Sequence, residues 1–238
     1  MSDWLSQAEW QAVVLSLRVA FWAALLGLPP ALLVAHALAR WRFPGKALLN
    51  GVVHLPLILP PVVTGYLLLI GFGRRGPIGA LLEDWFGIVL AFRWTGAVLA
   101  AGIMAFPLTV RAIRLAIESV DPRLEQAAAT LGANRVRVFA TVTLPLILPG
   151  ILAGVVLGFA KAMGEFGATI TFVSNIPGQT QTLPSAIYAF LQVPGGEAQA
   201  LRLVGVAVAV SMTALLVSEW LARRVARRIG QDHGGRDA

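Results

Sequence analysis

The sequence contains no cysteine and little charge. None of its 238 residues is cysteine, and Asp, Glu, Lys and Arg together make up only 13%. A chain without cysteine has no disulfide framework, no thiolate metal site and no cysteine nucleophile. Its three histidines, His36, His54 and His233, are too far apart in sequence for a metal-binding pattern. Charge this sparse does not cover the surface of a soluble domain of this length, so the composition argues against a soluble globular protein.

Apolar residues take the place of charge: 57% of the chain is hydrophobic, and 24 glycines add to this. A helix of about 20 apolar residues crosses the hydrocarbon core of a bilayer. Five stretches are long enough, roughly 13–38, 48–72, 94–113, 146–173 and 203–221. The sequence therefore predicts an all-α membrane protein with a single domain, a polytopic bundle of about five transmembrane helices. A surface helix is expected within 78–90, a half-span helix at 185–191 and a flexible tail at 230–238.

The basic residues predict the orientation of the bundle. If the N-terminus lies outside, 13 Lys and Arg side chains flank the cytoplasmic ends of the spans and four flank the outer ends. Because basic residues are retained on the cytoplasmic side, we expect an inner-membrane protein with a periplasmic N-terminus and a cytoplasmic C-terminus. The net charge of +7 is then a topology signal. No basic soluble segment is present that would bind nucleic acid.

The segment 119–145 is the longest internal stretch without membrane character. Asp121 is a suitable N-cap ahead of Pro122, and Gly132 suits the left-handed position that ends a helix. Asn134 can cap a second short helix, expected over 135–142 and ended by Pro145. Alanines at 127–129 keep the first helix slim, which would let another protein's backbone approach closely. An amphipathic hairpin lying on lipid headgroups remains the alternative.

This segment resembles the EAA loop of bacterial ATP-binding-cassette importer permeases. Gln126-Ala127-Ala128, then Gly132, then Leu144-Pro145 carry the resemblance. In that family the loop holds the coupling helices that seat in the ATPase subunits. The resemblance implies this role for Arg123, Glu125, Gln126, Ala127, Ala128, Gly132, Ala133, Leu144 and Pro145. The chain departs from the family at Gln126, where a glutamate is usual, and Glu125 lies one place earlier.

Further segments are similar to the molybdate branch of the same family, namely 43–46, 54–65, 164–178 and 182–184. The resemblance implies the type I importer permease fold and a homodimer that forms a pathway for molybdate, with tungstate and sulfate as alternative oxyanions. It also implies two cytoplasmic ATPase subunits and a periplasmic oxyanion-binding protein as partners, besides membrane lipid. The chain has no G-x-x-x-x-G-K-S/T motif. We therefore expect ATP and magnesium on the partner ATPase, and neither cofactor, metal nor enzymatic activity in this chain.

Two charged residues, Lys161 and Glu165, lie inside the fourth predicted span. They are four positions apart, so they share one helix face. An isolated charge at the bilayer centre costs about 2.5 to 3.5 kcal/mol on insertion scales, whereas a pair largely neutralises itself. The two residues therefore form either a structural ion pair or part of a pathway for a dianion. After them, four polar side chains either line the outer end of the passage or bond back to their own helix: Thr169, Thr171, Ser174 and Asn175.

The same span carries glycines at every fourth position, Gly150, Gly154 and Gly158. Small residues at this spacing let helices approach closely in lipid, so we expect a packing face. Two other function classes are open. An ion-coupled carrier needs titratable groups near the midplane and repeated broken helices, and Lys161 and Glu165 are nearly the only such groups. A membrane-embedded enzyme needs a metal motif or a nucleophile with a base, and the sequence offers neither.

Overall fold

The computed structural model describes the backbone of residues 4–234, and the side chains in that range except 218, 219, 221–223 and 225–234. Every regular element of this described part is helical, which confirms the all-α prediction. Four helices are long and apolar enough to cross a membrane, and a strongly bent helix pair makes a fifth if it is counted as one span. The chain is thus the expected polytopic bundle.

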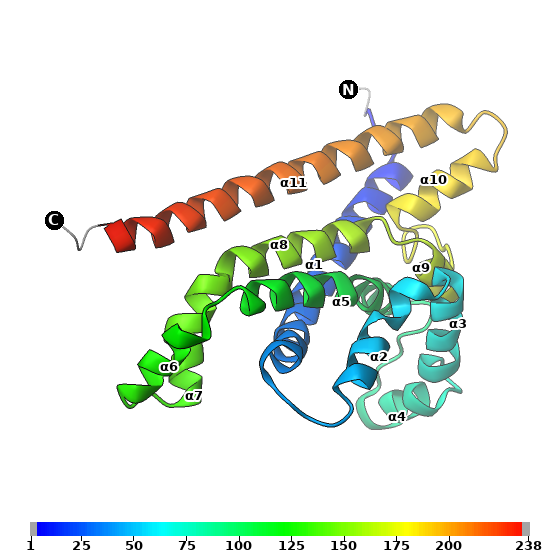
Figure 1. The fold of residues 1–238 in the computed structure, drawn as a ribbon. Helices are drawn as coiled ribbons and strands as arrows, with labels where there is room; N and C mark the ends of the chain where they lie inside the picture. The colour runs from blue at the N-terminus through cyan, green and yellow to red at the C-terminus, as the bar shows by residue number, and fades with distance from the viewer. Residues whose placement is uncertain (1–3, 235–238) are drawn as a thin grey trace.

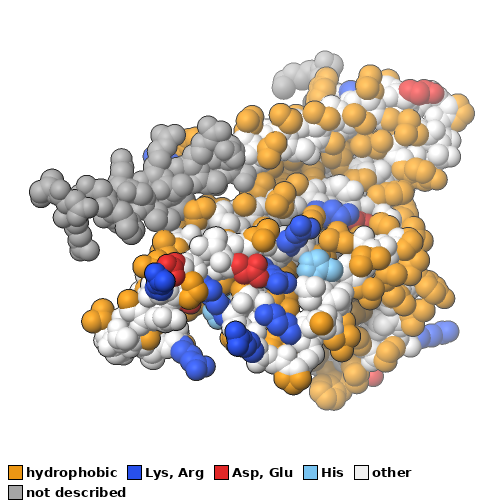
Figure 2. All heavy atoms as spheres, viewed as in Figure 1, with side chains coloured by type: hydrophobic (Ala, Val, Ile, Leu, Met, Phe, Trp, Pro, Cys, Tyr) orange, Lys and Arg blue, Asp and Glu red, His pale blue; other side chains and the backbone are white. Residues whose placement is uncertain are grey.

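Three long helices form the centre of the bundle: α1 (Gln7–Arg40), α5 (Trp94–Glu118) and α8 (Leu144–Met163). They pack against one another, and α11 (Glu197–Gly234) lies along α8 (Figure 1). Buried apolar side chains form two clusters between these helices. Many large apolar side chains are nevertheless exposed, and Figure 2 shows them over much of the visible face. Such a surface is stable in lipid rather than in water.

The glycines of α8 lie against α5, as their spacing predicts. A Cβ atom at Gly150 would lie 2.2 Å from the Cβ of Ala116, and one at Gly158 would lie 2.5 Å from the Oγ1 of Thr109. Thr109 also donates a hydrogen bond across the interface to the carbonyl of Gly154, at 3.3 Å. The absence of side chains at these positions is therefore what lets the two helices approach this closely.

The second span is broken, which corrects the expectation of one continuous helix. It consists of α2 (Lys46–Ile58) and α3 (Pro61–Phe72), bent by 113°. Leu59 and Pro60 between them are extended, with ψ of 144° and 134°. A residue before proline is disfavoured in the helical conformation. Because prolines follow at positions 60 and 61, both Leu59 and Pro60 precede a proline and leave the helical conformation. Pro61 is the first residue of α3, where a backbone N–H would have no hydrogen-bond partner within the helix.

The fourth span is also interrupted, which corrects the expected continuous helix over 146–173. Helix α8 ends at Met163, and α9 (Gly167–Val173) begins after a three-residue break. At this break the carboxylate of Glu165 accepts the backbone N–H of Ala168 at 2.9 Å. That bond satisfies one of the donors left free at the start of a helix, so it stabilises the first turn of α9.

Helices α3 and α9, which follow the two breaks, pack against each other. A Cβ atom at Gly65 would lie 2.5 Å from the carbonyl oxygen of Ala168, and one at Gly167 would lie 2.7 Å from the Cβ of Pro61. A side chain is excluded at both positions, because Gly65 lies against the backbone of Ala168 and Gly167 lies against the rigid ring of Pro61. Figure 1 shows this contact at one end of the bundle, near α10.

The shorter elements agree with the sequence. Helix α4 (Pro77–Phe86) is the expected surface helix, and α10 (Leu183–Leu191) is the expected half-span helix. Each begins with proline in its first turn, where proline is well tolerated. The expected tail at 230–238 overlaps the end of α11, which continues to Gly234. Residues 235–238 lie outside the described range.

Candidate functional site

The segment that resembles the coupling loop forms a hairpin at the end of the bundle opposite α9 (Figure 1). Its first helix is α6 (Pro122–Thr130). Asp121 caps this helix as expected, since its carboxylate accepts the N–H of Arg123 at 2.9 Å. Gly132 has a φ of +85°, the left-handed conformation in which glycine is favoured. Asn134 then caps the second arm. The helix, glycine turn and helix predicted from the sequence are all present.

The second arm does not stop at Pro145, and this corrects the expected helix end. Helix α7 (Arg135–Val138) continues through a π-helical turn, η1 (Phe139–Thr143), directly into α8. In that turn the N–H of Leu144 donates to the carbonyl of Phe139, five residues back. Proline breaks a regular α-helix because it lacks an N–H and clashes with the preceding turn. The wider π-turn lets Pro145 follow without a break, so this arm is a direct extension of α8.

Glu125 anchors the hairpin to the bundle. Its Oε1 accepts a hydrogen bond from the Oγ1 of Thr143 at 2.8 Å and lies 3.3 Å from the Nη2 of Arg40. The same Arg40 nitrogen donates to the carbonyl of Val120 at 3.0 Å. Both charged side chains are about one-fifth exposed. Glu125 therefore points inward, whereas Gln126 beside it is exposed. Arg40 and Thr143 could not be predicted as partners of Glu125, because they lie 85 and 18 positions away from it in the chain.

The outer surface of the hairpin is open and partly apolar. No residue of α6 is buried, and Leu131 and Val136, on either side of the Gly132 turn, are 89% and 77% exposed. Ala127 is exposed and Ala128 is half-buried. Large apolar side chains exposed on a charged segment outside the spans indicate a protein-binding surface. Exposure of Leu131 and Val136 was not predicted, although both apolar residues flank the glycine turn in the sequence.

A cavity of about 660 Å³ separates the end of α1 from the hairpin. Its walls carry three arginines, Arg40, Arg42 and Arg135, and one carboxylate, Glu125. The uncharged side chains of Gln126 and Ala133 and the ring of His36 also line it. Of the other residues assigned to the coupling loop, Arg123 and Pro145 are exposed, and Leu144 packs against the core cluster around Ile113. The hairpin is thus joined to the bundle at the Glu125–Arg40 contact and through the continuous helix from α7 to α8. The cavity lies between these two attachments.

Lys161 and Glu165 form the ion pair that their spacing predicts. The Nζ of Lys161 lies 2.6 Å from the Oε2 of Glu165. The carboxylate is 2% exposed and the ammonium side chain is 29% exposed. Because the other carboxylate oxygen accepts the N–H of Ala168, Glu165 both neutralises Lys161 and starts α9. One buried side chain therefore holds together the two helices on either side of the break.

The polar residues after this pair serve mainly the local backbone. Thr169 donates its hydroxyl proton to the carbonyl of Phe166, the residue just before α9, at 2.9 Å, and Thr171 donates to the carbonyl of Gly167 in α9 at 2.8 Å. Ser174 has a φ of +66° at the end of α9. The amide nitrogen of Asn175 lies 3.5 Å from the carbonyl of Ser185, and its Oδ1 is buried with no hydrogen-bond partner among the described residues. Asn175 is the one of the four with a buried polar atom that lacks a hydrogen-bond partner among the described residues.

A bundle of apolar helices with an exposed, partly apolar hairpin at one end defines a membrane component that binds a partner outside the bilayer. Residues 27–231 match the family model of the binding-protein-dependent transport system inner membrane component, and the chain belongs to this family. Its members are transport subunits rather than enzymes, which agrees with the expectation from the sequence.

Individual relatives agree with this assignment. The molybdenum transport system permease protein ModB of Escherichia coli (strain K12) is 63% identical over 227 residues, which cover 95% of this chain and 99% of that protein. The sulfate transport system permease protein CysT of Salmonella typhimurium is 35% identical over 221 residues, covering 92% and 78%. Among solved structures, a bacterial ABC transporter that imports alginate matches with a TM-score of 0.72 at 19% identity, covering 92% and 80%. That likeness confirms the importer permease fold.

Proposed function

We propose that this chain is the permease subunit of an ATP-driven importer, and that two copies form a pathway for molybdate across the inner membrane. The observation that carries the proposal is the 63% identity to the E. coli molybdenum permease over nearly the whole of both chains. The 35% identity to the sulfate permease favours molybdate over sulfate. Tungstate is a tetrahedral dianion like molybdate, and we expect it to share the pathway.

In this proposal, two cytoplasmic ATPase subunits dock on the hairpins of the two permease chains. Leu131 and Val136 supply apolar contact area, and Arg123 and Gln126 supply polar contacts around it. ATP and magnesium bind to the ATPase subunits, because this sequence has no phosphate-binding loop of its own. A periplasmic oxyanion-binding protein delivers the anion at the opposite end of the bundle.

Movement of the ATPase subunits reaches the passage through the two attachments of the hairpin. The continuous helix from α7 through η1 to α8 carries displacement directly into the fourth span. The Glu125–Arg40 pair carries it into α1. Closure of the ATPases on ATP then turns the passage outward by rigid-body rotation between two packed states.

The proposed orientation places the N-terminus in the periplasm and the C-terminus in the cytoplasm. It is supported by the excess of basic residues at the ends of the spans on the hairpin side. In this orientation α4, α9 and α10 face the periplasm, and the hairpin faces the ATPase.

Within the passage, we assign Lys161 to the attraction of the anion and Glu165 to its release. The ammonium side chain is 29% exposed, so it is accessible to a dianion, while the buried carboxylate beside it offsets most of its charge. An uncompensated lysine would bind a dianion too tightly to let it pass. We assign Asn175 to the outer part of the same passage, because its buried Oδ1 has no hydrogen-bond partner among the described residues and could receive one there.

The test is reconstitution of the chain in vesicles with its ATPase and its binding protein. We expect molybdate and tungstate to stimulate ATP hydrolysis severalfold and sulfate to have little effect. Vesicles lacking this chain are the control. Stimulation by sulfate alone would overturn the substrate assignment. Uptake by vesicles containing only this chain, driven by an ion gradient, would instead identify a secondary carrier.

A further inference from the structure

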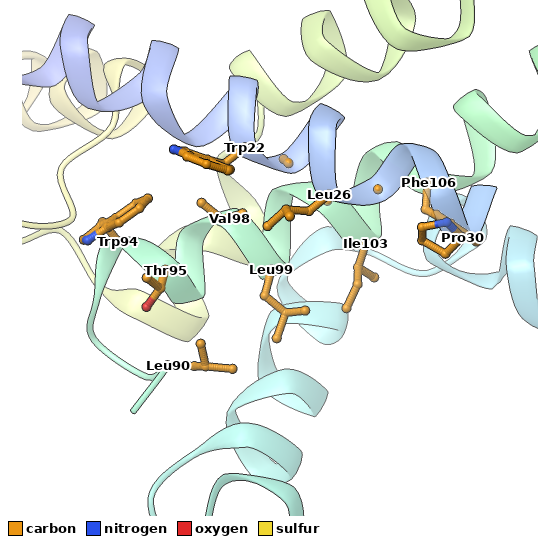
Figure 3. A pocket seen from close by; sticks show the side chains of 13 residues that line it. Trp22, Leu26, Pro30, Leu90, Trp94, Thr95, Val98, Leu99, Ile103 and Phe106 are labelled. Atoms are coloured by element: carbon orange, nitrogen blue, oxygen red, sulfur yellow. The ribbon is translucent and has the colours of Figure 1, made fainter. Parts of the chain in front are cut away.

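A groove of about 570 Å³ runs between α1 and α5 on the surface of the bundle (Figure 3). Trp22, Leu26 and Pro30 of α1 form one wall. Leu99 and Phe106 are among the side chains that α5 contributes to the other. The small residues Gly27 and Gly102 also line it. The groove is therefore open and apolar along its length. Neither the docking of the ATPase nor the passage of the anion, as proposed above, involves it.

The length of the groove matches one leaflet of a membrane. It extends along α5 from Trp94 to Phe106, which is about 18 Å at the rise of an α-helix. The hydrocarbon core of a bilayer is about 30 Å thick, so one acyl chain occupies about half of that. Trp94 lies at the start of α5, where an indole ring is suited to the membrane interface.

The outer end of the groove meets a second cavity of about 610 Å³ with a different character. The two share Trp94 and Thr95, and the second is also lined by Arg18 and Arg93. The guanidinium of Arg18 lies 3.7 Å above the centre of the Trp94 ring. Among the residues that the structure describes, no carboxylate lies within 4 Å of either arginine. Two positive charges thus lie at the mouth of an apolar groove without a negative partner there.

We propose that the groove and this cavity form one binding site for an anionic phospholipid. The acyl chain lies along the groove between the walls of α1 and α5, and the phosphate lies at Arg18 and Arg93. Arginine binds phosphate through paired N–H donors, and a guanidinium stacked on an indole is already oriented to do so. Arg18 falls inside the first predicted span, where a charge is costly unless it has a partner or reaches the headgroup layer. A bound phosphate supplies that partner.

The charge at the mouth favours a lipid over a second protein helix in the groove. A transmembrane helix packs through small residues and dispersion along its whole length, and it gains nothing from two unpaired arginines at one end. A lipid has the same division as the site, an apolar chain and an anionic head. Because α1 and α5 are central helices of the bundle, such a lipid also fills the gap between them and stabilises their packing.

Native mass spectrometry of the full-length chain in detergent tests the proposal, with phosphatidylglycerol and phosphatidylcholine of identical acyl chains as probes. We expect one phosphatidylglycerol per chain, bound about tenfold more tightly than phosphatidylcholine. Replacing both arginines, Arg18→Gln with Arg93→Gln, should make the two lipids bind alike. Gly27→Leu should remove binding of both, because a Cβ there meets no atom within 4 Å and the side chain extends into the open groove.

Gly205→Leu on α11 is the matched control, since a Cβ there is equally free of contacts and the position is outside the groove. It should bind phosphatidylglycerol like the native chain. The proposal is overturned if the native chain does not distinguish the two lipids, or if Gly27→Leu binds phosphatidylglycerol normally. Displacement of the lipid by millimolar molybdate would overturn it too, since the arginines would then form an oxyanion site. Should Gly27→Leu fail to assemble, the arginine variants decide, because both side chains are exposed.

Discussion

The carboxylate of Glu125 on α6 lies 3.3 Å from the guanidinium of Arg40, the last residue of α1 and 85 positions earlier in the chain. The hydroxyl of Thr143, at the end of the π-helical turn, donates to the same carboxylate oxygen at 2.8 Å. One side chain therefore joins the first arm of the hairpin to α1 and to the start of α8. Together with the unbroken second arm, this contact attaches both arms of the hairpin to the bundle.

Replacing Glu125 tests this attachment. Glu125→Ala leaves Arg40 partly buried without its partner, and we expect a cost of about 1 to 3 kcal/mol to the docked position of the hairpin. The variant should hydrolyse ATP with its partner subunits but import less anion per ATP. The control is Glu118→Ala, which removes an ion pair with Arg114 that is more exposed and contributes about 0.5 kcal/mol or less. Equal import per ATP in the two variants would show that Glu125 does not couple the hairpin to the bundle.

The exposed apolar residues of the hairpin should be needed for assembly with the ATPase. Leu131 is 89% exposed, so Leu131→Asp should leave the thermal unfolding midpoint of the isolated chain unchanged. A charge in the centre of an apolar contact should weaken co-purification of the ATPase at least severalfold. Trp85→Ser on α4 removes a similarly exposed apolar side chain far from the hairpin and serves as the comparison. Normal ATPase recovery with Leu131→Asp would place the docking surface elsewhere.

The ion pair in the fourth span should respond differently to single and double replacement. Lys161→Met leaves the buried Glu165 carboxylate without its ion-pair partner. Because the lysine side chain is 29% exposed, we expect a cost below the about 3 to 5 kcal/mol of a fully buried pair. Adding Glu165→Gln removes that charge and should restore most of the yield of folded chain. If Lys161 attracts the anion, the double variant should assemble and still fail to import molybdate. Import at the native rate by the folded double variant would limit the pair to a structural role.

Alanine should have opposite effects at two glycines of the spans. At Gly150 a Cβ would lie 2.2 Å from the Cβ of Ala116, and that methyl group has no rotamer by which to withdraw. We expect Gly150→Ala to cost about 1 to 3 kcal/mol. At Gly51 on α2 a Cβ meets nothing within 4 Å, so Gly51→Ala should add up to about 1 kcal/mol through helix propensity. Thermal unfolding in detergent measures both, and an equal shift in the same direction would contradict the close packing of α5 and α8.

The orientation can be tested without background labelling, because the chain has no cysteine. Ala127→Cys places a thiol on the exposed face of the hairpin, and Trp85→Cys places one on α4 at the other end. An impermeant thiol reagent applied to intact cells should label position 85 and leave position 127 unmodified until the membrane is opened. The reverse pattern would mean that the bundle is inserted in the opposite sense.

The sequence predicted the hairpin more closely than it predicted the spans. Capping by Asp121 and Asn134 and the glycine turn are local features, so residue types and their order are sufficient to predict them. The breaks at Pro60 and at Glu165 were not predicted, because the mean hydropathy of a span does not indicate where its helix bends or stops. The continuation of α7 into α8 was not predicted, because proline at position 145 would end a regular α-helix. The π-helical turn before Pro145 accommodates it, and this turn is visible only in the structure.

By itself, the sequence determined that the chain lies in a membrane, that it has about five apolar segments and that it belongs with importer permeases. These properties depend on composition, on helix caps and on motifs within a short stretch of chain. Only the tertiary structure decided that Glu125 faces Arg40 and Thr143, that α3 meets α9 through Gly65 and Gly167, and that Arg18 lies over Trp94 at the mouth of a groove. Such contacts join residues that are distant in sequence. They depend on where the helices bend and how closely they approach one another. Apolar side chains in lipid do not specify one helix packing by themselves, and the small residues, prolines and buried charges select it.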